Sequence, residues 1–253
     1  MVVDNKVEAV AEKNAKRENK RSAGQSSGKA AKYDGRHPLF HIKYFPMDMA
    51  RFVFYICMIG YRIKRHYLNE EAEKKCKWIK GGAVIVANHT AFDDPLYLNS
   101  LLWYRRNYYL AGEAVMDQAI KGPLLKSAGC IRIDRNISDI NAIRECVRVL
   151  KEGFTLNMFP EGGIHKDGDV AEIKKGAILI AVQAGVPIIP VYSEPRKNWI
   201  HRRRAVIGEP FEPKKYCAKK FPSMAELNQM NEELLTLIHA CEDKYKEVVS
   251  EKQ

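Results

Sequence analysis

A histidine and an aspartate stand five positions apart in the segment Asn88-His89-Thr90-Ala91-Phe92-Asp93-Asp94-Pro95. The segment follows the apolar run 83–87 and precedes a leucine-rich stretch, which indicates a turn from a strand into a helix. A histidine there can accept a proton from a hydroxyl near neutral pH, and a carboxylate on its other ring nitrogen fixes the tautomer and stabilises the imidazolium. His89 and Asp94 are therefore the candidate catalytic residues.

The spacing of the pair constrains the turn. Residues five positions apart do not share a helical face, so a contact between them requires a curved loop and a helix that begins at about Asp94. Asp94 is a suitable N-cap, and Pro95 suits the first helical position. The alternative interpretation is purely structural: Asp94 only caps the helix, and His89 is an ordinary loop histidine.

Three further segments follow the pair. Residues 129–135 are a glycine and an apolar strand ending in arginine, residues 159–162 are Phe-Pro-Glu-Gly, and residues 186–191 are Val-Pro-Ile-Ile-Pro-Val. Together with the His-x4-Asp motif of His89 and Asp94, their order and spacing resemble the lysophospholipid and 1-acyl-glycerol-3-phosphate acyltransferase family. The resemblance covers about residues 80 to 210, and no one segment carries it alone.

The resemblance implies an O-acyltransferase of phospholipid biosynthesis. It implies transfer of a fatty acyl group from acyl-CoA or acyl-carrier protein to a hydroxyl of a lysophospholipid, first of all 1-acyl-glycerol-3-phosphate. His89 then acts as the general base, and neither an enzyme nucleophile, a metal nor a resident cofactor is required. The residues expected to bind substrate are Arg135, Glu161, Gly162, Gly163 and Lys174.

One segment departs from the family pattern. After Phe-Pro-Glu-Gly the family usually has Thr-Arg-Ser, whereas residues 163–165 of this chain are Gly-Ile-His. The resemblance implies that the arginine binds the acceptor phosphate, for which a planar guanidinium is well suited. Either Arg135 and Lys174, with a weak contribution from His165, supply the positive charge, or the acceptor is a different lipid or alcohol. A catalytically silent membrane-binding relative is a further alternative.

Composition indicates an anionic partner. The 253-residue chain has a net charge of +11 and 46% apolar residues. Basic clusters at 62–65, 74–78 and 199–204 lie beside apolar or aromatic residues, which is typical of segments that bind a lipid surface. We therefore expect a peripheral or monotopic protein on the cytoplasmic face of the cell membrane, bound to its anionic surface. Nucleic acid is the disfavoured alternative because no nucleic-acid-binding motif is present, and solvated charged faces are the structural alternative.

The cysteine pattern argues against zinc ribbons and disulfide frameworks. The six cysteines show neither paired spacing nor a Cys-x-x-Cys motif, so reduced thiols fit best. A metal-dependent hydrolase that uses His89, Asp93, Asp94 and His165 is a rival interpretation, although their spacing matches no known metal site.

The chain divides into three expected parts. Residues 1–36 read as a disordered basic arm, 37–79 as a membrane-interface helical segment, and 80–253 as the acyltransferase domain. The apolar run 52–61 is too short for a bilayer core that needs ~20 residues. We expect 45–61 to lie in the membrane interface with Arg62, Lys64 and Arg65 at the lipid headgroups; the alternative is a helix packed on the domain.

Short apolar runs alternate with amphipathic stretches, which predicts an α/β domain with a mostly parallel or mixed central sheet flanked by helices. The expected strands are 83–88, 108–111, 130–133, 155–159, 188–192 and 205–207. The expected helices are 94–103, 138–152, 173–184 and 223–249. Gly185 reads as a helix stop, and Ser223 with Glu226 reads as a capping box.

Overall fold

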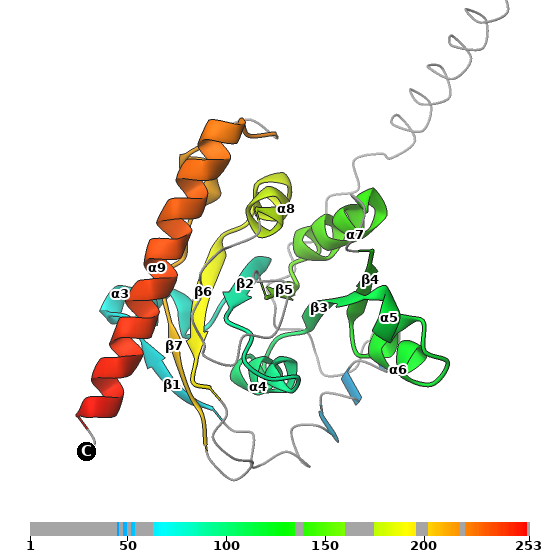
Figure 1. The fold of residues 1–253 in the computed structure, drawn as a ribbon, viewed down its shortest axis with the longest axis horizontal. Helices are drawn as coiled ribbons and strands as arrows, with labels where there is room; N and C mark the ends of the chain where they lie inside the picture. The colour runs from blue at the N-terminus through cyan, green and yellow to red at the C-terminus, as the bar shows by residue number, and fades with distance from the viewer. Residues whose placement is uncertain are drawn as a thin grey trace, which may run out of the picture. The chain divides into compact units, whose positions relative to one another are not determined.

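The computed structural model describes residues 63–134, 139–159, 175–195, 202–217 and 221–251, together with positions 45, 48, 49, 52 and 53. All of them belong to one compact unit, Lys32–Gln253. Through the described residues runs a seven-stranded sheet in the order β1-β7-β6-β2-β5-β3-β4 (Figure 1). The strands are β1 (Lys64–Tyr67), β2 (Ala83–Ala87), β3 (Asn107–Gly112), β4 (Cys130–Ile133), β5 (Thr155–Met158), β6 (Ile188–Ser193) and β7 (Arg204–Ile207).

Most of the sheet is parallel. Strands β2 to β6 run in one direction, β7 runs antiparallel to β6, and β1 pairs in parallel with β7. The carboxyl ends of the neighbouring strands β6, β2 and β5 therefore meet at one edge of the sheet, where open α/β sheets commonly bind ligands. The expected α/β fold with a mixed, mostly parallel sheet is confirmed.

An apolar core lies on each face of the sheet. Val84 and Val86 of β2 point into one core and Ile85 into the other, and all three are fully buried. A central strand covered on both faces reads as a continuous apolar run, which is why β2 was recognisable. The first core is covered by α7 (Ile140–Lys151), α8 (Gly176–Ala184) and α9 (Met224–Ser250), and the second by α3 (Glu70–Cys76) and α4 (Asp94–Leu101) (Figure 1).

The expected strands and helices are present with small shifts at their ends, and the first expected residues of α8 lie outside the described residues. Several short elements were not expected. Strand β1 reads Lys-Arg-His-Tyr and lacks apolar alternation, so its sequence resembles a basic cluster. The other unexpected elements are α3, α5 (Glu113–Met116), α6 (Lys121–Ser127) and the 3-10 turn η3 (Pro213–Lys215).

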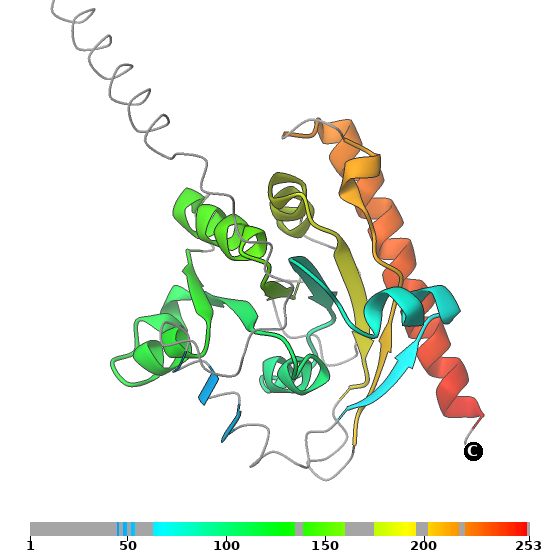
Figure 2. The same ribbon diagram turned by 180° about the vertical axis from the view of Figure 1, so that it is seen from behind.

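Strand β1 and helix α3 lie before the expected domain boundary at residue 80, yet they belong to the sheet domain. β1 pairs with β7 along its whole length (Figure 2). Ala72 and Cys76 of α3 are buried. Arg65, which was expected to meet lipid headgroups, instead donates to the carbonyl of Leu101. The expectation was wrong for Arg65 because its side chain points into the domain; Lys64 is exposed.

The amino-terminal expectations fall mostly outside the described residues. Residues 1–36 lie wholly outside them, and of 45–61 only five positions are described, all of them helical. In the part of the chain that the structure describes, no helix is both long and apolar enough to cross a membrane.

Two helix ends follow the signals read in the sequence. Gly185 ends α8 in the left-handed conformation, with φ of 73°, and its N–H donates to the carbonyls of Ala181 and Val182. Ser223 and Glu226 form the predicted capping box at the start of α9. Both ends are thereby supplied with hydrogen-bond partners for otherwise unpaired backbone groups.

Arg105 joins the amino ends of two central strands. Its guanidinium is buried and donates to the carbonyls of Ile79 and Gly81, in the segment before β2, and of Gly153, in the segment before β5. Removing a buried donor leaves its acceptors without partners, and each such acceptor costs about 1–3 kcal/mol. This arginine therefore stabilises the edge of the sheet opposite the His89 loop.

We expect Arg105→Met to lower the free energy of unfolding by about 3 kcal/mol or more, because two buried carbonyls and one part-buried carbonyl lose a donor. Urea denaturation measures the change. Arg148→Met is the matched control: the Arg148 side chain is 42% exposed in its pairs with Glu145 and Glu152, so we expect a loss below about 1 kcal/mol. Equal losses in the two variants would contradict this assignment.

Candidate active site

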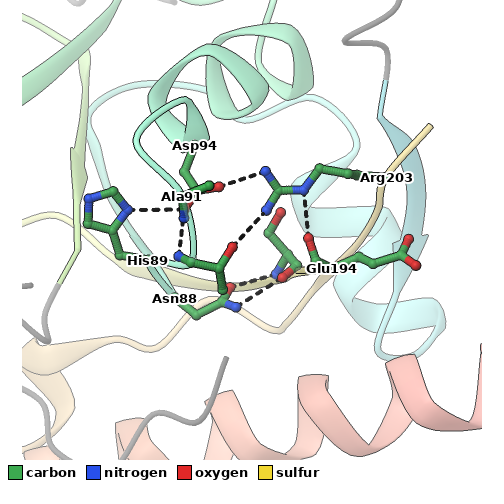
Figure 3. A network of polar contacts seen from close by, with 8 residues as sticks. Asn88, His89, Ala91, Asp94, Glu194 and Arg203 are labelled. Carbon is green, nitrogen blue, oxygen red and sulfur yellow. Dashed lines mark hydrogen bonds and ion pairs between the residues drawn. The ribbon is translucent and has the colours of Figure 1, made fainter. Parts of the chain in front are cut away.

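His89 and Asp94 are brought together by the loop that leaves the carboxyl end of β2. Nδ1 of His89 lies 3.0 Å from Oδ2 of Asp94 (Figure 3). The imidazole is 18% exposed, whereas the carboxylate is 2% exposed. The contact that the sequence predicted is therefore present, and it joins a ring that solvent can reach to an acid that it cannot.

The loop folds around the carboxylate of Asp94. The backbone N–H groups of Thr90 and Ala91 donate to Oδ2 at 2.6 and 2.8 Å, which closes the five-residue gap. The expectation that Asp94 caps α4 was wrong by one position: Asp93 is the N-cap, and Asp94 is the first helical residue. Its carboxylate turns back to the loop amides instead of bonding to the first turn of the helix.

The polar partners of Asp94 keep it ionised. Burial by itself raises the pKa of this carboxyl, but the hydrogen bond from His89, the charge of Arg203 and the Ala91 amide outweigh it, so the pKa lies below its usual value. An ionised carboxylate can only accept, so Nδ1 of His89 carries the hydrogen of this contact. Nε2 is then the ring nitrogen with a free electron pair, as a general base requires.

Arg203 lies on the far side of the same carboxylate (Figure 3). Its Nη1 donates to Oδ1 of Asp94 at 2.6 Å, Nη2 to the Thr90 hydroxyl at 3.2 Å, and Nε to the Glu194 carbonyl at 2.6 Å. The side chain is completely buried, and the Tyr97 ring lies 4.2 Å from the guanidinium carbon. One guanidinium thus ties the loop, α4 and the end of β6 together.

The basic cluster at 199–204, expected at a lipid surface, is partly internal. Arg203 contacts Asp94, and Arg204 lies within 3.4 Å of the buried Glu194 carboxylate, which also accepts the Arg204 backbone N–H. The expectation was wrong for these two arginines because buried acids are available to pair with them. Residues 199–201 lie outside the described residues.

Asn88 fixes the start of the loop. Its side-chain amide donates to the Ser193 carbonyl at 2.9 Å and accepts the Ser193 N–H at 2.7 Å. Both residues are buried. This pair of bonds extends the contact between β2 and β6 by one step beyond their backbone ladder, so the residue before His89 cannot shift along the neighbouring strand.

Aromatic side chains adjoin the loop. The Phe159 ring, which follows β5, stacks on His89 with centroids 4.2 Å apart and planes at 20°. Phe92, between the two candidate catalytic residues, is 80% exposed. His89 therefore has an apolar wall on one ring face, and an apolar side chain faces solvent three residues along the chain.

The remaining predicted site residues lie beyond the ends of the described segments. Phe159 is the last described residue before Glu161 and Gly162, and the chain after β4 is described only as far as Asp134. The residues that lie outside the described part are Arg135, Glu161, Gly162, Gly163, His165 and Lys174.

The described residues offer little for metal or cysteine chemistry at this site. No group of three or more His, Cys, Asp or Glu side chains among them is arranged to hold a metal ion, and both oxygens of Asp94 already accept hydrogen bonds. The five described cysteines are free. Burial raises the pKa of Cys76 and Cys146 to about 12, so these two remain neutral thiols.

Sequence reasoning found the acid and the base but missed Arg203. The pair is local and follows a recognisable strand, whereas Arg203 lies 109 positions from Asp94 and its sequence context is a run of three arginines. Asn88 offered a weak signal, since it stands at the end of the strand directly before His89. The assembled arrangement is an imidazole with one bonded and one free nitrogen, which can take a proton from a hydroxyl.

Known proteins resemble part of this chain in sequence. A chloroplastic 1-acyl-sn-glycerol-3-phosphate acyltransferase of Brassica napus is 30% identical over 111 residues, 43% of this chain and 31% of that protein. The enzyme of the same name from Bacillus subtilis is 26% identical over 168 residues, 64% of this chain and 82% of that protein. The chain thus matches only about a third of the length of the plant relative.

A solved structure gives the same fold. The 1-acyl-sn-glycerophosphate acyltransferase PlsC from Thermotoga maritima aligns with a TM-score of 0.53 and 23% identity, over 79% of each chain. The family model described as Acyltransferase matches residues 63–194, just over half of the 253 residues, and the match includes β1, the His89 loop and the end of β6. The chain is therefore a member of the acyltransferase family.

Proposed function

We propose that this protein transfers a fatty acyl group from a thioester to a hydroxyl of a lysophospholipid, with 1-acyl-glycerol-3-phosphate as the first candidate acceptor. The observation that carries the proposal is the His89 imidazole, whose Nδ1 is held by the buried Asp94 carboxylate while its Nε2 is left to accept a proton. The names of the relatives support the acceptor class. The reaction would serve phospholipid biosynthesis.

The proposed chemistry is a direct displacement. Nε2 of His89 takes the hydroxyl proton as the acceptor oxygen attacks the thioester carbonyl, so an oxygen–carbon bond forms and the carbon–sulfur bond breaks. The imidazolium, stabilised by Asp94, returns the proton to the leaving thiolate. General-base assistance contributes about two to four powers of ten in rate, so acceptor positioning and oxyanion stabilisation must contribute at least as much.

The acceptor site is proposed for residues of the Glu-Gly and arginine segments. Phe159 stacks on His89, so the residue two positions before Glu161 lies beside the base. We propose Glu161, Gly162 and Gly163 as the wall of the acceptor pocket. Positive charge for a phosphate would come from Arg135 and Lys174, because the family arginine is absent and residues 163–165 are Gly-Ile-His.

The donor is proposed to be acyl-CoA or acyl-carrier protein. Both are anionic, and a chain with a net charge of +11 attracts either. The donor is a co-substrate, so the mechanism requires no resident cofactor.

Membrane association is proposed through the helical positions 45, 49, 52 and 53. Phe45, Met49, Phe52 and Val53 are exposed and recur at the i, i+4, i+7, i+8 spacing of an apolar stripe. Asp48 in the same segment forms a buried ion pair with Arg106 at 2.6 Å, which ties the segment to the domain. The stripe would lie in the interface of an anionic cytoplasmic leaflet, as a peripheral contact.

The first test is substitution of the base. We expect His89→Ala to lower kcat by about two to four powers of ten because no other group takes the hydroxyl proton, while the circular dichroism spectrum and melting temperature stay close to those of the wild type. Transfer of a radiolabelled acyl group from acyl-CoA to 1-acyl-glycerol-3-phosphate measures the rate. His239→Ala is the matched control, since that histidine is 48% exposed on α9. Full activity in a folded His89→Ala protein would exclude His89 as the base, and an inactive wild type would favour the catalytically silent relative.

A second test concerns the acceptor. With wild-type protein we expect faster transfer to 1-acyl-glycerol-3-phosphate than to 1-acyl-glycerol, because Arg135 and Lys174 would bind the phosphate. Arg135→Gln and Lys174→Gln should each raise KM for the phosphate-bearing acceptor by about tenfold, and leave KM for 1-acyl-glycerol unchanged. Transfer to 1-acyl-glycerol alone would show that the altered segment at 163–165 accompanies a different acceptor.

A third test concerns the membrane. We expect Phe45→Ser combined with Phe52→Ser to weaken binding to phosphatidylglycerol-containing vesicles by about tenfold or more, since two large apolar side chains leave the interface. Vesicle co-sedimentation measures binding. Ile140→Ser removes an apolar side chain that is 58% exposed on α7, and it should bind vesicles as the wild type does. Unchanged binding of the double variant would place the lipid contact elsewhere.

A further inference from the structure

Arg203 determines how the Asp94 carboxylate is oriented. Three donors of the His89 loop, the imidazole and the Thr90 and Ala91 amides, converge on Oδ2. Oδ1 accepts from the guanidinium at 2.6 Å. With each oxygen assigned to a different set of donors, rotation of the carboxylate would break bonds on both sides.

The guanidinium is itself held in one position. It donates to the Thr90 hydroxyl and to the Glu194 carbonyl, lies against the Tyr97 ring and is completely buried. A planar fork can reach three acceptors at once, which a lysine ammonium on a flexible stem cannot do in the same geometry. Through these contacts, the end of β6 fixes where the guanidinium lies, and the guanidinium in turn fixes the Asp94 carboxylate beside His89.

We propose that Arg203 is a positioning residue of the transfer reaction: it aims the Asp94 carboxylate at His89 and limits how strongly that carboxylate favours the protonated imidazole. The proposal rests on the proposed function for its rate effect. It assigns to the residue a role that goes beyond stabilising the fold.

No other carboxylate described near Arg203 competes with Asp94 for its guanidinium. The Glu194 carboxylate at the end of β6 is engaged by the backbone and guanidinium of Arg204 on β7, whereas Arg203 donates to the Glu194 carbonyl. On α4 the adjacent groups are Asp94 itself, the N-cap Asp93 and the Tyr97 ring, and the uncharged Phe159, which follows β5, stacks on His89. Among the described residues, Arg203 is thus the cation whose guanidinium contacts the Asp94 carboxylate.

Removing the guanidinium has two effects on the pH dependence, and both have the same sign. Arg203 is among the groups that lower the pKa of Asp94 against the opposing effect of burial, so its loss raises that pKa and allows the carboxyl to protonate at a higher pH. While still ionised, a carboxylate that is no longer shared with a cation stabilises the imidazolium more strongly. In both cases the active pair, a neutral His89 beside an ionised Asp94, takes up a proton at a higher pH. The acidic limb of the pH–rate profile therefore moves to higher pH.

The test compares three variants of the full chain. In Arg203→Gln we expect kcat to fall about 100-fold at nearly constant KM, and the acidic limb to move up by about one pH unit. Arg203→Lys keeps the charge but not the fork, so its acidic limb should stay in place while kcat falls about tenfold. Arg202→Gln is the matched control, because it removes a neighbouring guanidinium whose residue is exposed, and its profile should match the wild type.

A second measurement does not depend on turnover. The hydrogen-bonded Nδ1–H proton of His89 should give a sharp low-field NMR signal in the wild type and in Arg202→Gln, and a broadened or absent signal in Arg203→Gln. The NMR signal still tests the positioning role of Arg203 if the wild type transfers no acyl group. That result would contradict the proposed function but not the positioning role.

Wild-type kcat, an unmoved acidic limb and a retained Nδ1–H signal in folded Arg203→Gln would overturn the proposal. If that variant does not fold, Arg203→Lys decides: an unchanged kcat and signal overturn the positioning role, and a lowered kcat in a folded protein supports it.

Discussion

One buried carboxylate holds the candidate site together. Asp94 is shared between an imidazole that solvent can reach and a guanidinium that it cannot, and two loop amides complete its shell. A charge at this depth is tolerated only where its partners are in place, because an unpaired buried ion costs several kcal/mol. The loop, helix α4 and the end of β6 are therefore positioned with respect to one side chain, and the base takes its orientation from it.

The parallel sheet explains why these groups can meet. Strands β6, β2 and β5 are neighbours, and each contributes to the site from its carboxyl end: Glu194 after β6, His89 after β2 and Phe159 after β5. The side chain of Asn88 joins the first two strands beyond their backbone bonds. At the opposite edge of the sheet, Arg105 joins the segments that lead into β2 and β5. The two ends of β2 are therefore fixed by different polar groups.

The predictable part of the structure is the local part. Strand β2 and the His89–Asp94 contact could be inferred because a fully apolar strand, a polar loop and a proline-led helix follow one another within a few residues. Strand β1 could not, since an edge strand of charged residues has no periodic apolar signal and depends on β7 for its pairing. Arg203 could not either, because a run of arginines reads as a surface until the acid that it meets is known. Helix α4 begins at Asp94 as expected, but Asp94 is its first helical residue and not its N-cap, because the carboxylate is engaged by the loop amides of Thr90 and Ala91.

The sequence distance between Asp94 and Arg203 has a consequence for how the protein is made. The two residues are 109 positions apart, and the chain between them contains β3, β4, β5 and β6. During synthesis the acid leaves the ribosome long before its guanidinium does, and a contact of such separation closes late because its loop entropy must first be offset by other structure. The strand and loop that carry His89 are thus made early, but the complete site assembles only when β7 joins the sheet.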